Sequence, residues 1–444
     1  MERIGVFICW CGSNIAGTVN VNELVDLLLE VPGVAHAQNY MYMCSDPGQE
    51  LIRNAIREKE LNRVVVASCS PRMHEKTFRK AAHSVGLNPF LVEIANIREQ
   101  CSWVHQGDKA AATQKAMNII LATIGKVRKN AALESIRVPL TRRALVVGAG
   151  VAGMTAAIEL GEAGYETFLV ERETEVGGKL RHLSKTFPFH ESASEILKAK
   201  ADALAKNENV RLMTNCELKD VTGYVGNFDV TLRSNYDGSE TKERIGAIVL
   251  ANGYDLYPVK AMGEYGAGEV EDVVDSLTFE RLLKESMEAG APVKRPSDGR
   301  AVESAVFIQC SGSRDPAHHK PYCSRVCCLY TSKQSKLLCQ QNSGAKAIVS
   351  YMDIRTDIKL CEEYCQENID SEGILYVRGR VSKLWREGDK VALWTADTLS
   401  GEKILIEADI VVLAQAIVPS RGSAELAQVV RASADQNGFL QESH

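Results

Sequence analysis

Residues 144–153 read Ala-Leu-Val-Val-Gly-Ala-Gly-Val-Ala-Gly, a strand-like apolar run that leads into the glycine pattern G-x-G-x-x-G. Gly148 allows a tight turn, Gly150 lets the backbone approach a pyrophosphate, and Gly153 lets the next helix pack close to the strand. The amino end of that helix offers free N–H groups to phosphates. The following strand ends at Glu171, where a carboxylate can accept from a ribose hydroxyl. The stretch therefore predicts a dinucleotide site on a Rossmann-type unit, because an accidental glycine turn would not supply Glu171.

The flanking segments favour FAD over NAD by resemblance. Residues 171–180 resemble the segment with which flavoproteins of the thioredoxin-reductase type approach FAD. Residues 248–254 resemble their Ala-Thr-Gly stretch, with Asn252 in place of Thr. The residues that we predict to bind FAD are Gly148, Ala149, Gly150, Val151, Ala152, Gly153, Glu171, Arg172, Gly177, Gly178, Lys179, Leu180 and Ala251.

The chain has 444 residues, 45% of them hydrophobic and 25% charged, and a net charge of −5. These values are typical of a soluble protein with two or three domains. Charges of both signs are interspersed, which argues against nucleic-acid binding. No apolar stretch approaches the ~20 residues of a membrane span, and the first residues lack the features of a signal peptide. We therefore expect a cytoplasmic protein with no membrane span.

Thirteen cysteines in a long chain without a leader indicate metal ligation or redox chemistry rather than structural disulfides. A second βαβ unit begins with the strand-like residues 305–309 and continues into cysteines where a pyridine-nucleotide domain would have a glycine turn. Four thiolates between a strand end and a helix start suit a [4Fe–4S] cluster. The alternatives are zinc, for which adjacent cysteines are awkward, a thiol redox relay, or inert cysteines. The predicted ligands are Cys310, Cys323, Cys327 and Cys328.

A further group of cysteines follows the predicted strands of residues 3–126, which alternate strand-like and helix-like segments. The carboxyl ends of parallel strands meet at one edge of a sheet, so these cysteines should converge there. We expect a second cluster on Cys11, Cys44, Cys69 and Cys101, the alternative being thiols that hold no metal. Cys9, inside the first strand, is assigned to the core.

The expected fold class is α/β: an N-terminal parallel-sheet domain followed by a two-dinucleotide-domain flavoprotein module of the thioredoxin-reductase type. The predicted divisions are 1–127 for the N-terminal domain, 128–143 for a linker, 144–300 for the FAD domain, 301–418 for the second Rossmann-like domain, and 419–444 for a truncated return to the FAD domain.

The chain as a whole resembles the family of heterodisulfide reductase A subunits. The resemblance includes Cys-x-Cys-Gly-x-Asn-Ile at 9–15, the stretches 68–78 and 96–101, Gly-Gly-Lys-Leu-Arg at 177–181, and the cysteine loop 310–328. It implies FAD and [4Fe–4S] clusters, with electron transfer that can include flavin-based bifurcation. It also implies B- and C-like partner subunits and an electron donor such as a ferredoxin, a hydrogenase or a flavin oxidoreductase, and it allows a homodimer.

Two departures from this family pattern are visible. Residues 226–228 run directly on to Ile248 without the inserted ferredoxin-like domain, and the chain stops before the strand and helix that would close the FAD domain. We expect a fragment or a site completed by another chain.

The leading hypothesis is an electron-transfer oxidoreductase subunit in which FAD, rather than a catalytic side chain, carries the chemistry. The alternatives are a pyridine-nucleotide-dependent disulfide reductase, which would need a redox cysteine pair and an open NAD site, and a scaffold without cofactors.

Overall fold

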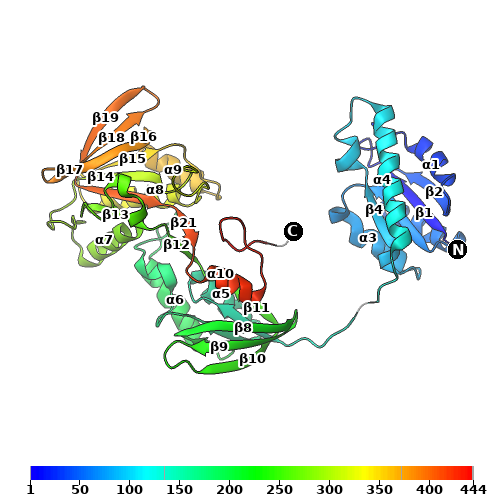
Figure 1. Ribbon diagram of the computed structural model, residues 1–444, viewed down its shortest axis with the longest axis horizontal. Coiled ribbons are helices and arrows are strands. Elements are labelled where there is room, and N and C mark those ends of the chain that lie inside the picture. The colour runs from blue at the N-terminus through cyan, green and yellow to red at the C-terminus, as the bar shows by residue number, and fades with distance from the viewer. Residues whose placement is uncertain (1, 135, 372, 443–444) are drawn as a thin grey trace. The chain divides into compact units, whose positions relative to one another are not determined.

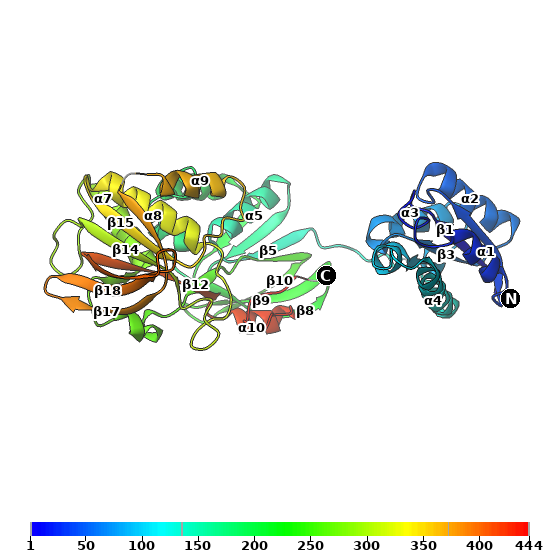
Figure 2. The same cartoon turned by 90° about the horizontal axis from the view of Figure 1, so that it is seen from above.

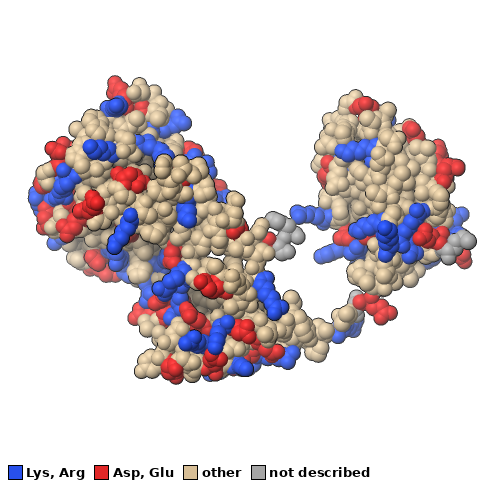
Figure 3. All heavy atoms as spheres, in the orientation of Figure 1, with Lys and Arg blue, Asp and Glu red and all other residues tan. Residues whose placement is uncertain are grey.

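The chain forms two compact units, Met1–Val138 and Pro139–His444, in the computed structural model, which describes residues 2–134, 136–371 and 373–442 (Figures 1 and 2). Both units contain parallel sheets covered by helices, so the predicted α/β class is confirmed. On the face of the second unit that Figure 3 shows, basic and acidic side chains are interspersed.

The first unit is a parallel sheet in the order β2-β1-β3-β4. Its strands are β1 (Ile4–Cys9), β2 (Val34–Tyr40), β3 (Arg63–Ser68) and β4 (Val92–Asn96). Its helices are α1 (Val21–Leu29), α2 (Asp46–Glu58), α3 (Pro71–His83) and α4 (Lys109–Lys129), with short η1 (Pro89–Leu91) and the π-helix η2 (Arg98–Ser102).

Helices cover the two faces of this sheet in pairs. One core contains side chains of α1 and α4, including Leu24 and Leu28, and the other contains side chains of α2 and α3, including Ile52 and Phe78. The chain turns in opposite directions after β1 and after β3, which lie side by side. In such a sheet this switch point opens a crevice at the carboxyl ends of the strands.

The start of α2 lies one residue away from the position that its sequence predicts. The pair Asp46-Pro47 predicts a cap at Asp46, but Ser45 is the N-cap and Asp46 is the first helical residue. The Ser45 hydroxyl accepts a hydrogen bond from the N–H of Gly48 at 3.3 Å. A serine at this place satisfies one of the free N–H groups of the first turn.

The first half of the second unit combines a parallel sheet, β11-β5-β6-β7, with the antiparallel sheet β10-β9-β8. The strands are β5 (Arg143–Val147), β6 (Glu166–Val170), β7 (Val210–Met213), β8 (Cys216–Tyr224), β9 (Asn227–Ser234), β10 (Glu240–Ile245) and β11 (Ala247–Leu250). The helices are α5 (Val151–Glu162), η3 (Gly178–His182) and α6 (Ala193–Lys206). Cores on both faces of the parallel sheet bury Leu145, Phe168 and Leu169.

The second half repeats this plan with the parallel sheet β13-β20-β14-β15-β16 and the antiparallel sheet β17-β18-β19. Its strands are β13 (Val273–Asp275), β14 (Ser304–Ser311), β15 (Lys346–Tyr351), β16 (Ile374–Arg378), β17 (Val381–Glu387), β18 (Lys390–Asp397), β19 (Glu402–Ala408) and β20 (Ile410–Gln415). Its helices are η4 (Val259–Ala261), η5 (Gly263–Tyr265), α7 (Ser276–Ala289), α8 (Cys327–Gln341) and α9 (Cys361–Ile369). The finer domain boundaries given above stay predictions.

The chain crosses between the two halves through β12 (Tyr254–Leu256) and β21 (Ile417–Pro419), which pair antiparallel. After β21 it returns to the first half as α10 (Ser423–Val430), whose Leu426, Val429 and Val430 pack on the core of β8 and β9. Among the helices that the structure describes, none has the length and apolar character needed to cross a membrane.

Candidate functional site

The carboxyl ends of β5, β6 and β11 open onto a cavity of about 830 Å³ in the second unit. The glycine loop after β5 and the start of α5 form one wall, and Glu171 and Arg172 after β6 form the next. Every residue predicted to bind FAD lines this cavity except Ala149 and Gly153, which lie behind the wall. A cavity of this size at the switch edge of a parallel sheet suits a dinucleotide.

The glycine loop has the geometry that its sequence predicts. Gly148 has φ +100°, a left-handed conformation, and a side chain there would meet the carbonyl of Ala251. A Cβ at Gly153 would overlap the carbonyl oxygen of Gly148, whereas a Cβ at Gly150 would meet nothing within 4 Å. Gly153 is therefore required for packing of α5 on the strand, and Gly150 leaves open space at the amino end of that helix.

Glu171 holds the loop from the next strand. Its side chain is buried, Oε2 accepts from the N–H of Ala149 at 2.7 Å, and Oε1 accepts from the N–H of Glu173 at 3.0 Å. Gly177 donates its N–H to the carbonyl of Ala149 at 2.7 Å. The acidic residue, the glycine loop and the Gly-Gly turn thus form one connected wall.

The remaining walls come from distant segments that local sequence patterns do not connect to the site. They are Cys216–Lys219 on β8, Asn252–Asp255, Leu277, and Arg421–Val429 at and within α10. Asn252 donates from Nδ2 to the hydroxyls of Ser420 and Ser423 at 2.9 and 2.7 Å. The polar side chain at position 252 is the one sequence feature that could have indicated this contact, but its hydrogen-bond partners lie more than 160 residues away in the chain.

Lys179 and Asp255 form a charged pair on the cavity wall, 3.4 Å apart, and the Lys179 ammonium lies over the ring of Tyr254. Burial alone would raise the pKa of Asp255, but the N–H of Arg421 and the charge of Lys179 outweigh it, so the pKa lies below its usual value. Asp255 is therefore held as a carboxylate that joins the Gly-Gly segment to the start of α10.

The cysteine loop after β14 brings three of its four predicted ligands into contact. Cys310 is the next-to-last residue of β14 and has a left-handed conformation, with φ +56°, and Cys327 and Cys328 begin α8. A hydrogen bond from Cys327 is the main reason that the pKa of Cys310 falls to about 7, and the thiols of Cys327 and Cys328 are also hydrogen-bonded to each other. Cys323 lies on the same loop, and its sulfur accepts from the N–H of Arg325 at 3.4 Å.

Nitrogen donors surround the sulfurs of this loop. The Arg314 side chain hydrogen-bonds to Cys310 and forms a two-point ion pair with Asp353, at 2.6 and 3.0 Å. The N–H of Arg355 points at the sulfur of Cys328 at 3.5 Å. Donors directed at sulfur stabilise thiolates that ligate metal. Sequence reasoning missed these donors, because only the folded arrangement brings their N–H groups next to the sulfurs.

A buried ion pair lies beside the same helix. Lys333 Nζ is 2.6 Å from Glu280, with both side chains almost fully buried, and also donates to the carbonyl of Lys185 at 2.7 Å. Glu280 accepts from the N–H and hydroxyl of Ser184 at 3.1 and 2.9 Å. Because Leu183 lines the cavity, this pair ties the cavity wall to α7 and α8.

Only some of the cysteines of the first unit lie close to one another. Cys69 lies near enough to Cys11 and Cys44 for their charges to act on its pKa, which burial raises above the usual value. Arg98, with a side chain 12% exposed, donates from Nη1 to the sulfur of Cys11 at 3.1 Å. Cys101 is fully buried, and its sulfur is 3.1 Å from the carbonyl of Ala112 on α4.

Within residues 2–134, 136–371 and 373–442, no group of three or more His, Cys, Asp or Glu side chains is arranged to hold a single metal ion. The donors at the loop 310–328 are thiols, most of them buried and met by N–H groups. That donor set fits an iron–sulfur cluster better than it fits a hard cation, which needs oxygen ligands.

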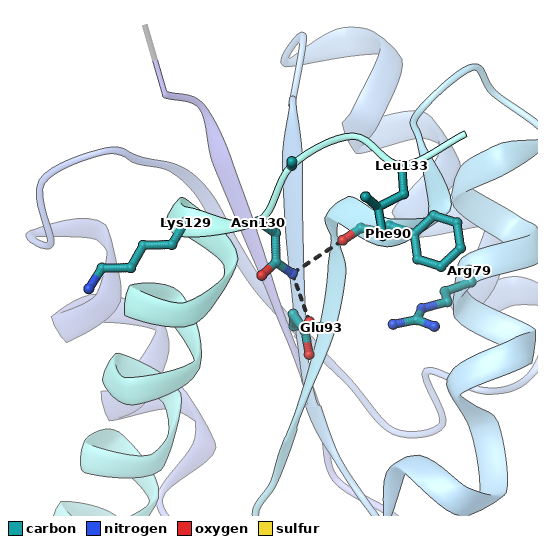
Figure 4. Close-up of a pocket in the computed structure, with 7 residues that line it drawn as sticks. Arg79, Phe90, Glu93, Lys129, Asn130 and Leu133 are labelled. Carbon is teal, nitrogen blue, oxygen red and sulfur yellow. Dashed lines mark hydrogen bonds between the residues drawn. The ribbon is translucent and has the colours of Figure 1, made fainter. Parts of the chain in front are cut away.

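A smaller cavity, of about 350 Å³, lies in the first unit at the opposite end of the sheet (Figure 4). Phe90 in η1 and Glu93 at the amino end of β4 line it together with Arg79 and residues at and after the end of α4. Asn130 Nδ2 donates to Glu93 at 2.7 Å and to the carbonyl of Phe90 at 3.2 Å. The cysteines follow the carboxyl ends of the strands, so this cavity is not part of their site.

Part of the second unit matches a known protein family. Residues 142–289 match the family described as pyridine nucleotide-disulphide oxidoreductase. Thioredoxin reductases of Lactococcus lactis and T. acidophilum superpose with TM-scores of 0.45 and 0.43, at 15% and 16% identity. They cover 68% of this chain, and 85% and 84% of their own chains are matched.

Similarity to curated proteins extends over the whole chain. An iron–sulfur A subunit of the CoB–CoM heterodisulfide reductase of Methanopyrus kandleri is 36% identical, over 100% of this chain and 79% of its own length. The corresponding protein of Methanocaldococcus jannaschii is 34% identical with the same coverage. Each alignment runs over 518 positions, whereas this chain has 444 residues, so the relatives carry segments without a counterpart here. The resemblance seen in the sequence is confirmed: the chain is an oxidoreductase that belongs to the family of heterodisulfide reductase A subunits.

Proposed function

We propose that this chain is the FAD-containing iron–sulfur electron-transfer subunit of a heterodisulfide reductase-like complex. The observation that carries the proposal is the set of N–H donors around the loop 310–328. Arg314, Arg325 and Arg355 each direct a donor at a different cysteine sulfur. Hydrogen bonds to cysteine sulfur are a main determinant of the reduction potential of iron–sulfur clusters.

FAD fits the cavity of the second unit. The N–H groups at the start of α5 would hold the pyrophosphate, and Gly150 leaves room for it. Glu171 would face the ribose, and the segment Arg421–Val429 would cover the far side. Bound FAD supplies a group that exchanges electrons singly or in pairs.

Cys310, Cys323, Cys327 and Cys328 would hold the [4Fe–4S] cluster nearest this cavity. Ligating thiols must be deprotonated, and the Arg314 guanidinium offsets part of the resulting negative charge. The cluster would occupy the place where a pyridine-nucleotide domain has its glycine turn. The residues of this loop therefore support electron transfer rather than hydride transfer from NAD(P)H.

The partners of this chain follow from the family. A relative from Methanothermobacter thermautotrophicus is named as the A subunit of an H2:CoB-CoM heterodisulfide,ferredoxin reductase. We extend this to B- and C-like subunits that carry the disulfide-reducing site and to a ferredoxin as one electron carrier. Flavin-based bifurcation is part of the same proposal.

The test is the iron, acid-labile sulfide and flavin content of the full chain purified without oxygen. We expect one FAD and about eight irons per chain, for two [4Fe–4S] clusters. Cys327→Ser should remove about four irons and leave FAD bound. Normal iron in that variant would contradict the assignment, and bleaching of the flavin by NADPH alone would favour a pyridine-nucleotide-dependent disulfide reductase.

A further inference from the structure

A layer of side chains separates the FAD cavity from the cysteine loop 310–328. Tyr254, the first residue of β12, and Leu277, in the first turn of α7, both line the cavity. Among the described residues that line it there is no cysteine of the loop. Electrons that pass between the two sites must therefore cross the side chains that lie between them.

Tyr330 lies against the thiols of this loop. It is in the first turn of α8, two residues after Cys328. Its side chain packs on the small core that Cys327, Cys328 and Ala414 form. Tyr330 thus lies beside two of the four predicted ligands of the cluster.

The hydroxyl end of Tyr330 reaches the cavity wall. It donates to the carbonyl of Gln415 at 3.5 Å and lies close enough to Ser276 and Tyr254 to interact with both. Gln415 Oε1 in turn accepts a hydrogen bond from the N–H of Ser276 at 3.3 Å. Because Ser276 directly precedes Leu277, Tyr330 extends from the thiols to the residues that form the cavity wall.

Ile354 packs on the same thiol core from another direction. It also contacts the buried residues Leu329 and Cys361, which belong to the core beneath α9. The described contacts of Ile354 therefore lead toward α9, whereas those of Tyr330 lead toward α7 and the cavity.

We propose that Tyr330 is the positioning residue that couples the FAD cavity to the cluster of the loop 310–328, with its ring as the packed contact through which single electrons pass. Electron tunnelling weakens steeply with distance, and it is faster through atoms in contact than across a gap. Each passage moves one electron from flavin to cluster or back, while Tyr330 keeps its proton and forms or breaks no bond. This inference rests on the proposed function, since it assumes that both cofactors are bound.

Replacement of the ring tests the inference in the full chain purified without oxygen. Tyr330→Leu removes the ring, Tyr330→Phe removes only the hydroxyl, and Ile354→Val is the matched control on the same thiol core. A light flash with a sacrificial electron donor reduces the flavin, and absorbance and electron paramagnetic resonance follow reduction of the cluster. We expect Tyr330→Leu to slow this step by on the order of tenfold, because lost contact between reacting groups lowers their rate steeply. The other two variants should keep the wild-type rate.

Iron and flavin per chain, and the reduction potentials of both cofactors, distinguish a lost contact from a general disturbance. We expect all of them to stay at wild-type values in Tyr330→Leu. An unchanged rate in that variant with both cofactors bound would overturn the inference. Equal slowing in Tyr330→Phe or Ile354→Val, or a slower rate explained by shifted potentials, would overturn it as well.

A variant that loses its cluster also gives an answer. If Tyr330→Leu loses iron, Tyr330→Met, which has a longer and more flexible side chain, takes its place. Loss of iron in both would overturn the inference, because Tyr330 would then be a structural residue of the loop. A wild-type chain without iron or without flavin would instead contradict the proposed function itself.

Discussion

Gly150 and Gly153 are three residues apart on the same loop, yet they serve different purposes. A side chain at Gly150 would project into the cavity, and its φ of −71° is open to any residue. A side chain at Gly153 would strike the backbone of Gly148. The first glycine therefore serves ligand access and the second serves the fold.

We expect Gly150→Val to abolish flavin binding while the fold stays intact, and Gly153→Ala to destabilise the second unit by about 1–3 kcal/mol through overpacking. Flavin absorbance per protein and thermal unfolding of both variants check this. Full flavin occupancy in Gly150→Val would contradict the position of the pyrophosphate.

Arg98 is a charged residue in direct contact with one thiol of the first unit, that of Cys11. It contacts Cys11, Glu99 and the ring of Trp103, and its Nε atom is buried without a hydrogen-bond partner among the described residues. An N–H donor directed at a ligating sulfur favours the reduced cluster, because reduction adds negative charge.

Arg98→Met should therefore lower the reduction potential of the cluster proposed for this unit. A tenfold loss in the equilibrium constant for its one-electron reduction corresponds to a shift on the order of 59 mV. Arg79→Met is the matched control. Arg79 also pairs with a glutamate and lies over an aromatic ring, but it lines the cavity at the amino end of the sheet. A redox titration should show a lower reduction potential in Arg98→Met and no change in Arg79→Met. Equal shifts in both variants would mean that the loss of one positive charge, and not the contact with Cys11, changes the potential.

At the scale of elements, α9 is joined to the segment before α6 by a polar contact. His190 Nε2 lies 2.7 Å from the hydroxyl of Tyr364 on α9. Burial, together with the charges of Lys336, Lys185 and Lys333, lowers the pKa of His190 below its usual value. The neutral imidazole is thus the form that the folded chain accommodates.

This contact predicts a pH dependence of stability. The unfolded chain takes up a proton at His190 near the usual pKa of about 6.5, before the folded chain does, so stability is full above that pH and falls below it. His190→Asn, which tolerates the left-handed backbone at this position, should show a shallower decline between about pH 7 and pH 5. Thermal unfolding at several pH values measures it, and parallel curves for both proteins would contradict the assignment.

At the scale of the whole molecule, the two units have separate cores joined by residues 130–141. The described residues of 131–140 are exposed, among them Arg137. Each unit has its own parallel sheet and its own predicted iron–sulfur site, so each should fold by itself.

Limited trypsin treatment should cut near Arg137 and leave two folded fragments. We expect the larger fragment to keep FAD and about four irons, and the smaller one to keep about four irons and no flavin. Size-exclusion chromatography followed by metal analysis would show this. Aggregation of either fragment after a single cut would contradict independent folding.

The sequence by itself determined the dinucleotide loop, because strand, glycine turn and helix are contiguous and their chemistry is local. It also determined the α/β class, since the alternation of segments leaves few other arrangements. Tertiary structure alone decided the far wall of the cavity at Arg421–Val429, the buried pair of Lys333 and Glu280, and the donors of Arg98 and Arg314. Tertiary structure also placed Cys9 and Cys101 in different cores. These features depend on which face of a sheet a side chain occupies and on contacts between distant segments, and spacing along the chain does not encode them.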